Sequence, residues 1–198
     1  MSTRCSWATG PEYLSYHDDE WGRPVVDEDA LFERLCLEGF QAGLSWLTIL
    51  RKRPAFREAF AGFSIDAVAR FGARDVRRLM ADAGIVRNLA KIDATIANAK
   101  AAAALHEQGE TLAALIWGAA PARRRLAPRS TADLPATTPE SNALSRELKR
   151  RGFRFVGPTT VYAAMQACGV VNDHVLGCVA RGACERERRA ALATVPRS

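Results

Sequence analysis

Cysteine and histidine side chains occur in pairs near both ends of this 198-residue chain. His174 and Cys178 are four positions apart, a spacing that places both side chains on one face of a helix. Cys5 and His17 lie near the other end of the chain. Two thiolates and two imidazoles suit a tetrahedral structural zinc ion, one per chain. If all four residues bind one ion, the rest of the chain must fold between its two joined ends.

The spacing of these residues is not the compact pattern of a zinc finger. Cys178 can instead be a small buried apolar residue, and His174 a hydrogen-bonded histidine of the core. Only three histidines are present, however, and two of them, His17 and His174, belong to the Cys/His pairs. The residues therefore suggest a zinc site and leave the core interpretation open.

The composition limits the class of protein. A length of 198 residues and a hydrophobic share of 48% are typical of one globular domain or two small lobes. No apolar run approaches the roughly 20 residues of a membrane span, and the N-terminus lacks the apolar segment of a signal peptide. We therefore expect a cytoplasmic protein whose cysteines are thiols or metal ligands. The net charge of +6 favours an anionic partner, with nucleic acid as the first candidate.

Apolar residues recur at helical spacing along most of the chain, and no segment shows the clear alternation of a strand. The predicted fold class is all-α. Asp27 and Ser45 are suited to cap the helices that follow them, and Gly39 and Gly43 are expected to end the first of these helices. Helices are expected at residues 11–20, 27–41, 46–60, a short one from 64, 73–83, 89–106, one from 141, and one from 159 or 160 to 168.

A tight apolar turn separates two of the predicted helices. The first, at residues 73–83, is expected to end at Gly84, a residue type that favours the position just after a helix. In a helix-hairpin-helix unit, the backbone amides of such a turn and the start of the next helix bind a DNA phosphate. An ordinary helical hairpin has the same pattern, so the pattern alone leaves both interpretations open.

Two segments are predicted to be irregular. Residues 119–140 contain four prolines and the run Arg123, Arg124 and Arg125, so we expect an exposed connection. Its arginines either contact DNA or remain solvated, and solvation is the simpler interpretation. The segment after Cys178 is small and charged, and it is predicted to be frayed.

Several blocks of sequence, taken together, resemble the 3-methyladenine DNA glycosylase I family. They occur in order and with sensible spacing from about residue 4 to residue 178. No single block is diagnostic, but their joint occurrence is specific. Residues 88–90 are less polar than the family leads us to expect. The blocks are residues 4–7 (RCSW), 13 with 16–22 (YHDDEWG), 36–46 (CLEGFQAGLSW), 82–87 (DAGIVR), 151–157 (RGFRFVG) and 165–174 (MQACGVVNDH).

The resemblance implies a helix-hairpin-helix DNA glycosylase fold built as a single domain over residues 1–198. One lobe would combine both terminal segments, about residues 1–30 and 140–198, and would be held by zinc. The helix-hairpin-helix lobe would cover about residues 31–118. The implied partner is double-stranded DNA with alkylated bases, bound by a monomer associated with the nucleoid. The implied zinc ligands are Cys5, His17, His174 and Cys178.

The implied reaction is excision of 3-methyladenine, which starts base excision repair. Methylation at N3 gives the base a positive charge, so the base is already a good leaving group. The enzyme must extract the nucleotide from the stack, hold the base and admit water to C1′. No general base is assigned, and Asp173, beside His174, is predicted to support a metal ligand or the fold.

Glu38 is the candidate catalytic residue. It lies at an otherwise apolar helix end, where a lone carboxylate is costly unless it is paired or exposed. A solvent-facing glutamate is the alternative. In the family that the chain resembles, this position contacts the flipped base. An ionised Glu38 is therefore assigned to recognition of the cationic base and not to water activation.

Aromatic residues near the N-terminus are the candidates for base binding. A ring that stacks on a base contributes about 1–3 kcal/mol, and its face also attracts a cation. Each ring can instead be a core aromatic, an alternative that carries more weight for Trp7 and Trp21 than for the residues that the resemblance supports. The substrate-binding candidates are Tyr13, Tyr16, Trp21 and Trp46, with Trp7 as a further one.

DNA contacts are expected at two turns. Residues 41–44 resemble the segment that fills the gap left by a flipped nucleotide. There Gly43 lets the backbone approach DNA closely, and Leu44 is the candidate apolar wedge, unless it is a plain core leucine. Gly84 and Arg87 are the candidates for contacts at the hairpin.

Two other classes of function compete with the glycosylase interpretation. A non-catalytic, zinc-containing DNA-binding or lesion-recognition module would not need Glu38 together with Tyr16 and Trp46. A basic all-α metabolic enzyme would not show salt-dependent binding to DNA.

Overall fold

The structure, a computed structural model, describes residues 3–122 and 126–195, and its regular elements are helices. The three arginines Arg123, Arg124 and Arg125 lie outside the described residues. A single bridge pairs Thr3 with Cys178, and no longer strand occurs in the described ranges, so the all-α prediction is confirmed. The elements are α1 (Pro11–Asp19), α2 (Glu28–Gln41), α3 (Trp46–Ala59), η1 (Ala61–Phe63), α4 (Ile65–Ala69), α5 (Ala73–Ala81), α6 (Leu89–Glu107), α7 (Leu112–Gly118), η2 (Thr131–Asp133), α8 (Pro139–Arg150), α9 (Pro158–Ala167) and α10 (Arg181–Thr194).

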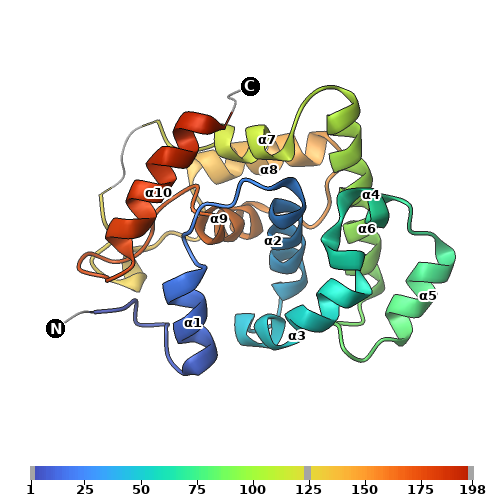
Figure 1. Cartoon of the computed structure of the whole chain (residues 1–198), viewed down its shortest axis with the longest axis horizontal. Coiled ribbons are helices and arrows are strands. Elements are labelled where there is room, and N and C mark those ends of the chain that lie inside the picture. The colour runs from blue at the N-terminus through green and yellow to red at the C-terminus, as the bar shows by residue number, and fades with distance from the viewer. Residues whose placement is uncertain (1–2, 123–125, 196–198) are drawn as a thin grey trace.

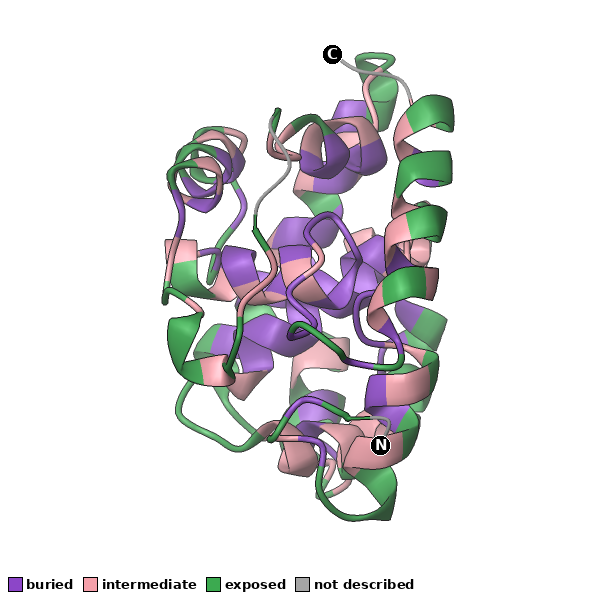
Figure 2. Cartoon of the chain, turned by 90° about the vertical axis from the view of Figure 1, so that its left-hand side faces the viewer, coloured by how far each residue is buried: buried purple, intermediate pink, exposed green. Residues whose placement is uncertain are grey.

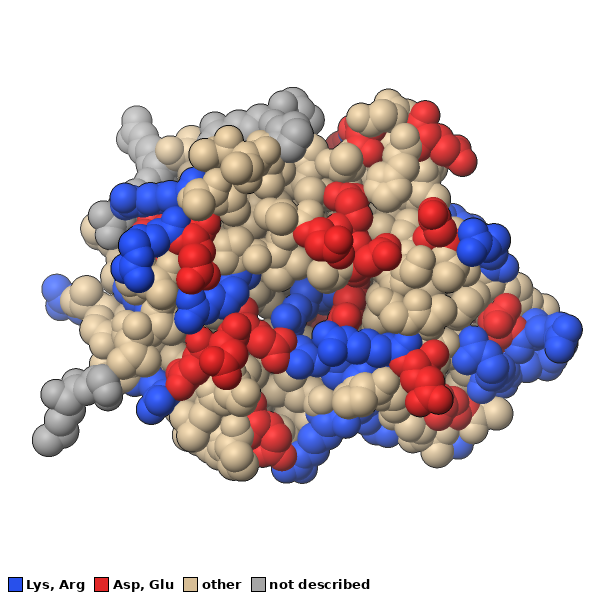
Figure 3. Space-filling view, viewed as in Figure 1, with Lys and Arg blue, Asp and Glu red and all other residues tan. Residues whose placement is uncertain are grey.

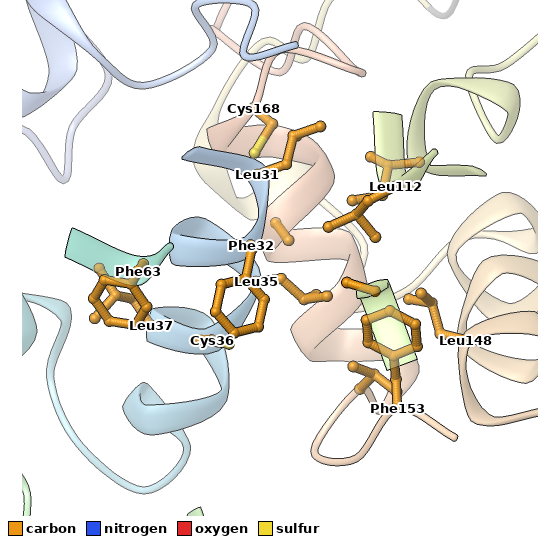
Figure 4. Close-up of a cluster of buried hydrophobic side chains, with 14 of the residues drawn as sticks. Leu31, Phe32, Leu35, Cys36, Leu37, Phe63, Leu112, Leu148, Phe153 and Cys168 are labelled. Carbon is orange, nitrogen blue, oxygen red and sulfur yellow. The ribbon is translucent and has the colours of Figure 1, made fainter. Parts of the chain in front are cut away.

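Helix α2 lies at the centre of the molecule and contacts α3, α6, α7 and α9 (Figure 1). Asp27 caps it as predicted, because its Oδ1 accepts a hydrogen bond of 2.9 Å from the amide of Ala30. Its buried residues include Leu31, Phe32 and Leu35, which pack in one cluster with side chains from α7, α8 and α9 (Figure 4). Burial on nearly all sides makes α2 the element against which the others are positioned.

In Figure 1, α7 and α8 lie above α2, and two further groups of helices lie on either side of it. Helices α1 and α10 and the N-terminal segment lie on one side, and α3 to α6 lie on the other. The first side, seen face-on in Figure 2, has buried positions at its centre and exposed positions along the outer faces of its helices. None of the described helices is long and apolar enough to cross a membrane.

Two glycines differ from their predicted roles. Gly39 lies inside α2, where a Cβ would come within 3.4 Å of the Phe155 Cβ, so its lack of a side chain serves close packing. Gly84 is not a helix-ending residue, because α5 ends at Ala81. A Cβ on Gly84 would lie 2.9 Å from the Ala55 Cβ, and the hairpin therefore packs directly on α3. Gly43 does follow the end of α2 and has a φ of 83°.

The prediction of a frayed tail is wrong, because residues 181–194 form α10. Alanine, glutamate and arginine are good helix formers, and Glu185 pairs with Arg188 at 3.1 Å and with Arg189 at 3.2 Å along the helix. Helix α7 was not expected from the sequence. Helices α8 and α9 begin one or two residues earlier than predicted, at Pro139 and Pro158, because proline suits the first turn.

Candidate functional site

A pocket of about 340 Å³ opens between α1, the end of α2, the start of α3, and α9. This volume falls within the range of about 300–1,000 Å³ that is typical of small-molecule sites. All six residues that the sequence analysis named for catalysis or base binding, Trp7 included, line it. The lining residues are Trp7, Tyr13, Tyr16, Trp21, Glu38, Gln41, Trp46, Leu134, Ala163 and Gln166.

The aromatic wall is built by α1 and the first turn of α3. Tyr13 and Tyr16 share one face of α1 because they are three positions apart. The Tyr13 hydroxyl accepts a hydrogen bond of 3.1 Å from the amide of Leu47, one of the free amides at the start of α3. This bond holds the helix that carries Trp46, whose ring lies 5.4 Å from that of Tyr16. Two separate segments are thereby held in one wall.

The segments that flank α1 add two indoles. The Trp7 ring lies 5.1 Å from Trp21 and 5.8 Å from Tyr13, in edge-to-face geometry in both cases. The sequence left open whether Trp7 and Trp21 are core or pocket residues. Both line the pocket, and Trp21 is also buried, with only 9% of its surface exposed. Trp117 belongs to the core, where its Nε1 donates to the Val25 carbonyl at 2.8 Å.

Glu38 points into this pocket without a protein partner. It is 6% exposed, and none of the described residues forms a hydrogen bond or ion pair with its carboxyl group. Desolvation raises its pKa to about 8, and the positive charge of Arg34 only partly opposes that rise. The raised pKa therefore favours the protonated form of Glu38 at pH 7 over the ionised form that was expected from the sequence. A cation in the pocket would favour its ionised form.

Arg34 lies near Glu38 but is already engaged by another carboxylate. Its guanidinium lies 5.8 Å from the centre of the Tyr16 ring and binds Glu20 at 2.7 Å. Burial works against the Glu20 charge, but hydrogen bonds from Arg53 and Arg34 outweigh it and lower the Glu20 pKa to about 2. Glu20 thus takes up the nearby positive charge, and Glu38 remains available to a ligand.

The raised pKa of Glu38 predicts a pH signature in stability. In the unfolded chain the carboxyl group ionises near the ordinary glutamate pKa of 4.5, whereas in the folded pocket it holds its proton up to about 8. The contribution of Glu38 to folding stability therefore falls as the pH rises from about 5 to 8, by at most about 1.4 kcal/mol per pH unit. Denaturant unfolding should show that the free energy of unfolding of Glu38→Gln increases relative to that of the wild type across this pH range. Above this range the difference between the two should be constant.

The matched control is Glu58→Gln on the exposed side of α3. This variant should keep a constant stability difference from the wild type at every pH. Parallel curves for Glu38→Gln and the wild type would show that Glu38 is not held in its protonated form.

The opposite wall of the pocket contains residues that the sequence did not single out. Gln166, on α9, donates from Nε2 to Asp173 Oδ2 at 3.0 Å, and the Tyr162 hydroxyl donates to the same oxygen. Asp173 thus supports the pocket-lining Gln166 and does not itself line the pocket. Gln166 lies within the MQACGVVNDH block, so the resemblance contained a signal for it.

Leu134 reaches the pocket from the proline-rich stretch that was predicted to be only an exposed connection. Two contacts hold this stretch against the terminal segments. The Thr131 hydroxyl lies 3.0 Å from the Ser6 Oγ, and the amide of Leu176 donates to the Pro128 carbonyl at 2.7 Å. No local signal in the sequence could have placed Leu134, because its position depends on these distant contacts.

Cys5, His17, His174 and Cys178 form one buried cluster behind the aromatic wall, with ligand atoms within 4.8 Å of one another. Cys178 Sγ lies 3.4 Å from both His17 Nε2 and His174 Nδ1, and Cys5 Sγ lies 3.7 Å from His174 Nδ1. A tetrahedral zinc ion, with Zn–S of about 2.3 Å and Zn–N of about 2.1 Å, sets S···N separations of about 3.6 Å. The donor set and its spacing therefore fit a metal ion.

Hydrogen bonds orient both imidazoles in the cluster. The Asp18 carboxylate lies 2.8 Å from His17 Nδ1 and is itself bound by Arg4 at 2.8 Å. The Trp21 carbonyl lies 3.0 Å from His174 Nε2. Each contact leaves the other ring nitrogen facing the sulfur atoms, as metal-binding histidines require. Trp21 joins the two sites, because its backbone holds His174 and its ring lines the pocket.

The residues predicted to contact DNA lie outside the pocket on two turns. Leu44 is 40% exposed, so the alternative of a plain core leucine is wrong. Gly84 and the exposed Arg87 lie in the hairpin between α5 and α6, which we define as residues 82–88. At its end, Asn88 Oδ1 accepts a hydrogen bond of 3.1 Å from the amide of Lys91 and caps α6. The first amides of α6 remain without a helical partner, as at any helix start.

Charges of both signs are mixed on the face shown in Figure 3. Lysine and arginine side chains there alternate with aspartate and glutamate. The net charge of +6 therefore does not produce a continuous basic surface on this face.

Comparison with known proteins gives consistent matches. Residues 7–181 match the family model described as methyladenine glycosylase. The chain is 47% identical over 177 residues to DNA-3-methyladenine glycosylase 1 of Escherichia coli (strain K12), covering 88% of this chain and 95% of that protein. A crystal structure of 3-methyladenine DNA glycosylase I matches with a TM-score of 0.86 and 45% identity, covering 89% of this chain and 98% of that one. A Staphylococcus aureus 3-methyladenine DNA glycosylase I, solved to explain 3-methyladenine recognition, matches with a TM-score of 0.85 and 35% identity, covering 91% and 97%.

Proposed function

Because the chain belongs to the methyladenine glycosylase family, we propose that it removes 3-methyladenine from alkylated DNA by hydrolysing the N-glycosidic bond. The chain is then an enzyme of base excision repair, and its substrate is a nucleotide flipped out of double-stranded DNA. The unpaired, buried carboxyl group of Glu38 within an aromatic pocket is the observation that carries this proposal.

The pocket suits a flat cationic base. The rings of Tyr16 and Trp46 offer faces that attract positive charge, and stacking on them offsets part of the cost of extracting the nucleotide. Glu38 ionises as the cation enters, accepts a hydrogen bond from the base, and holds the positive charge in place. Tyr13 and Trp21 complete the wall against which the base rests. Neutral adenine gains less from the same carboxylate, so the charge of the base is the basis of selection.

Hydrolysis itself needs little from the protein once the cationic base is held. The base leaves as a neutral molecule, water attacks C1′ as the sugar develops positive charge, and the added water loses one proton to solvent. Glu38 is the one carboxylate that lines the pocket among the described residues, and we assign it to the base and not to the water.

The buried Cys/His cluster holds a structural zinc ion in this proposal, one per chain. Cys5 and His17 would bind it from the N-terminal segment, and His174 and Cys178 from the segment before α10. Zinc supplies a fixed link between these segments and no chemistry in the pocket. The terminal segments and the hairpin would then act as two lobes of one domain, in a cytoplasmic monomer at the nucleoid.

The two exposed turns would contact DNA. The plug turn, residues 41–44, would insert Leu44 into the gap left by the flipped nucleotide, and the φ of 83° at Gly43 shapes this turn. Gly84 brings the hairpin backbone close to α3, and the exposed Arg87 would contact a phosphate.

Leu44→Ala should slow release of 3-methyladenine from duplex DNA by about tenfold, since losing a wedge raises the cost of separating the bases by roughly 1–2 kcal/mol. Affinity for the free base should not change, because Leu44 does not line the pocket. Single-turnover release and NMR titration of the free base measure the two effects. Leu126→Ala, at a leucine that is 96% exposed, is the control. If Leu44→Ala weakened free-base binding as much as it slowed base release, Leu44 would not act as the wedge.

The function is tested by incubating the purified chain with methylated duplex DNA and separating the released bases by chromatography. Release of 3-methyladenine is the expected result. Binding to the lesion without release would favour the non-catalytic module, and absence of salt-dependent binding would favour the metabolic enzyme.

A further inference from the structure

Lys91 binds the end of α2 from a different helix. It lies in the first turn of α6, directly after the hairpin, and its side chain is 8% exposed. Its Nζ donates to the Phe40 carbonyl at 2.8 Å and to the Ala42 carbonyl at 2.7 Å. Both carbonyls belong to the last turn of α2 and its junction with the plug turn, which carries Leu44.

The physical reason for this contact is the charge at a helix end. The last carbonyls of α2 have no helical partner and carry the negative end of the helix dipole. The last turn of α2 contains no basic residue of its own, so the positive charge comes from α6. A buried ammonium group is costly, and burial lowers the Lys91 pKa. The two carbonyls compensate that cost.

Lys52 makes the reverse contact. It lies on α3, the helix that follows the plug turn, and its Nζ donates to the carbonyls of Ala83 and Gly84 at 2.9 and 3.1 Å. These carbonyls belong to the hairpin that precedes α6. Gly84 also packs against Ala55 of α3, as its missing Cβ allows. Each of the two helices thus follows one turn along the chain and holds the other turn through a lysine.

We propose that Lys91 and Lys52 form a reciprocal lysine clamp, a pair of positioning residues that fixes the plug turn relative to the hairpin. The inference rests on the proposed function. When the hairpin binds a DNA phosphate, the clamp determines where Leu44 enters the duplex.

The clamp acts on the DNA step and not on the base pocket itself. Neither lysine lines the pocket, so a free base should bind equally well with or without the clamp. A lysine that served only general stability would have a different effect. Its removal would lower the melting temperature and would not distinguish duplex DNA from free base.

The test is a double-mutant cycle with Lys91→Met, Lys52→Met and both together, since methionine keeps the length of the side chain and removes the charge. Single-turnover release of 3-methyladenine from methylated duplex is measured with saturating protein, beside NMR titration of free 3-methyladenine. Binding to a duplex that carries an uncleavable abasic analogue is measured in parallel. Lys149→Met, at an exposed lysine of α8, controls for the loss of one positive charge.

The proposal expects each single variant to slow release by about tenfold or more, with free-base affinity within about twofold of the wild type. The double variant should be no slower than about the slower single variant, because both lysines serve one linkage. Release within about twofold of the Lys149→Met control in a folded Lys91→Met or Lys52→Met protein would overturn the proposal. Multiplying effects in the double variant, or parallel loss of free-base binding, would overturn it as well.

These outcomes are separable from the proposed function. An inactive wild-type chain would count against base excision. The clamp is then decided by binding to the abasic duplex, which needs no chemistry. Binding by Lys91→Met or Lys52→Met that is at least about tenfold weaker than that of Lys149→Met supports the clamp, and binding within about twofold of that control overturns it. Lys52→Met keeps the test available if the buried Lys91→Met variant does not fold, because Lys52 is only partly buried.

Discussion

Replacing Glu38 with glutamine will reduce release of 3-methyladenine from methylated duplex DNA by roughly 10²–10³-fold, the cost of losing one electrostatic contact to a reacting group in a closed site. Glutamine keeps the size of the side chain and one hydrogen-bond acceptor, but it cannot place a negative charge beside the cationic base. The fold should persist, because Glu38 forms no hydrogen bond or ion pair with the described residues. Base release under single-turnover conditions measures the loss.

Binding of the free base should also depend on the charge of Glu38. NMR titration is expected to show weaker binding of 3-methyladenine to Glu38→Gln than to the wild type, while Glu58→Gln, at an exposed position of α3, matches the wild type in both assays. Wild-type release by Glu38→Gln would remove the carboxyl group from the mechanism and leave the aromatic rings as the basis of recognition.

If the Cys/His cluster holds the proposed zinc ion, we expect a chelator to lower the melting temperature by about 10–20 °C, which corresponds to about 5 kcal/mol in a chain of this length. This loss is smaller than the roughly 10–16 kcal/mol of zinc binding in finger peptides, because the present chain has a core of its own. The cluster links Cys5 and His17 to His174 and Cys178, so its loss frees the N-terminal segment that carries Trp7 and the wall residue Trp21. Activity should fall along with stability.

Thermal unfolding with and without a chelator, together with metal analysis of the purified protein, provides the measurement. Cys178→Ser should resemble the chelated wild type and should not respond further to chelator. Cys36→Ala is the matched control, because Cys36 is a buried cysteine of the main core outside the cluster and should leave the chelator response intact. Identical unfolding curves with and without chelator would contradict a structural metal.

The helices and their caps followed from local chemistry. Asp27 and Ser45 cap α2 and α3 as predicted, because a short polar side chain before an apolar periodic segment satisfies free amides nearby. Where the prediction was wrong, packing decided. Gly39 stays within α2 because it lies against Phe155, and Gly84 is required by the contact with Ala55. Neither neighbour is close in the sequence.

Some residues of the site were also predicted from the sequence, and others were missed. The resemblance pointed to Glu38, Tyr16 and Trp46 because they lie in contiguous blocks, and the pocket contains all three. Leu134, Asp18 and the two lysines of the clamp were missed. Leu134 and the two lysines depend on contacts with distant segments, which no local pattern marks, whereas Asp18 contacts its neighbour His17 and was simply not assigned a role.

The sequence by itself determined the helical class, most helix boundaries and the presence of the four metal-type residues, because these depend on periodicity, capping and side-chain chemistry, while the residues assigned to the cationic base came from the family resemblance. Only the tertiary structure decided that Glu38 is buried without a protein partner, since its pKa is raised by desolvation in the pocket while Arg34, the nearby cation, is paired with Glu20. It also decided how the plug turn and the hairpin are held together, since that depends on distances between residues about 50 and 31 positions apart in the chain.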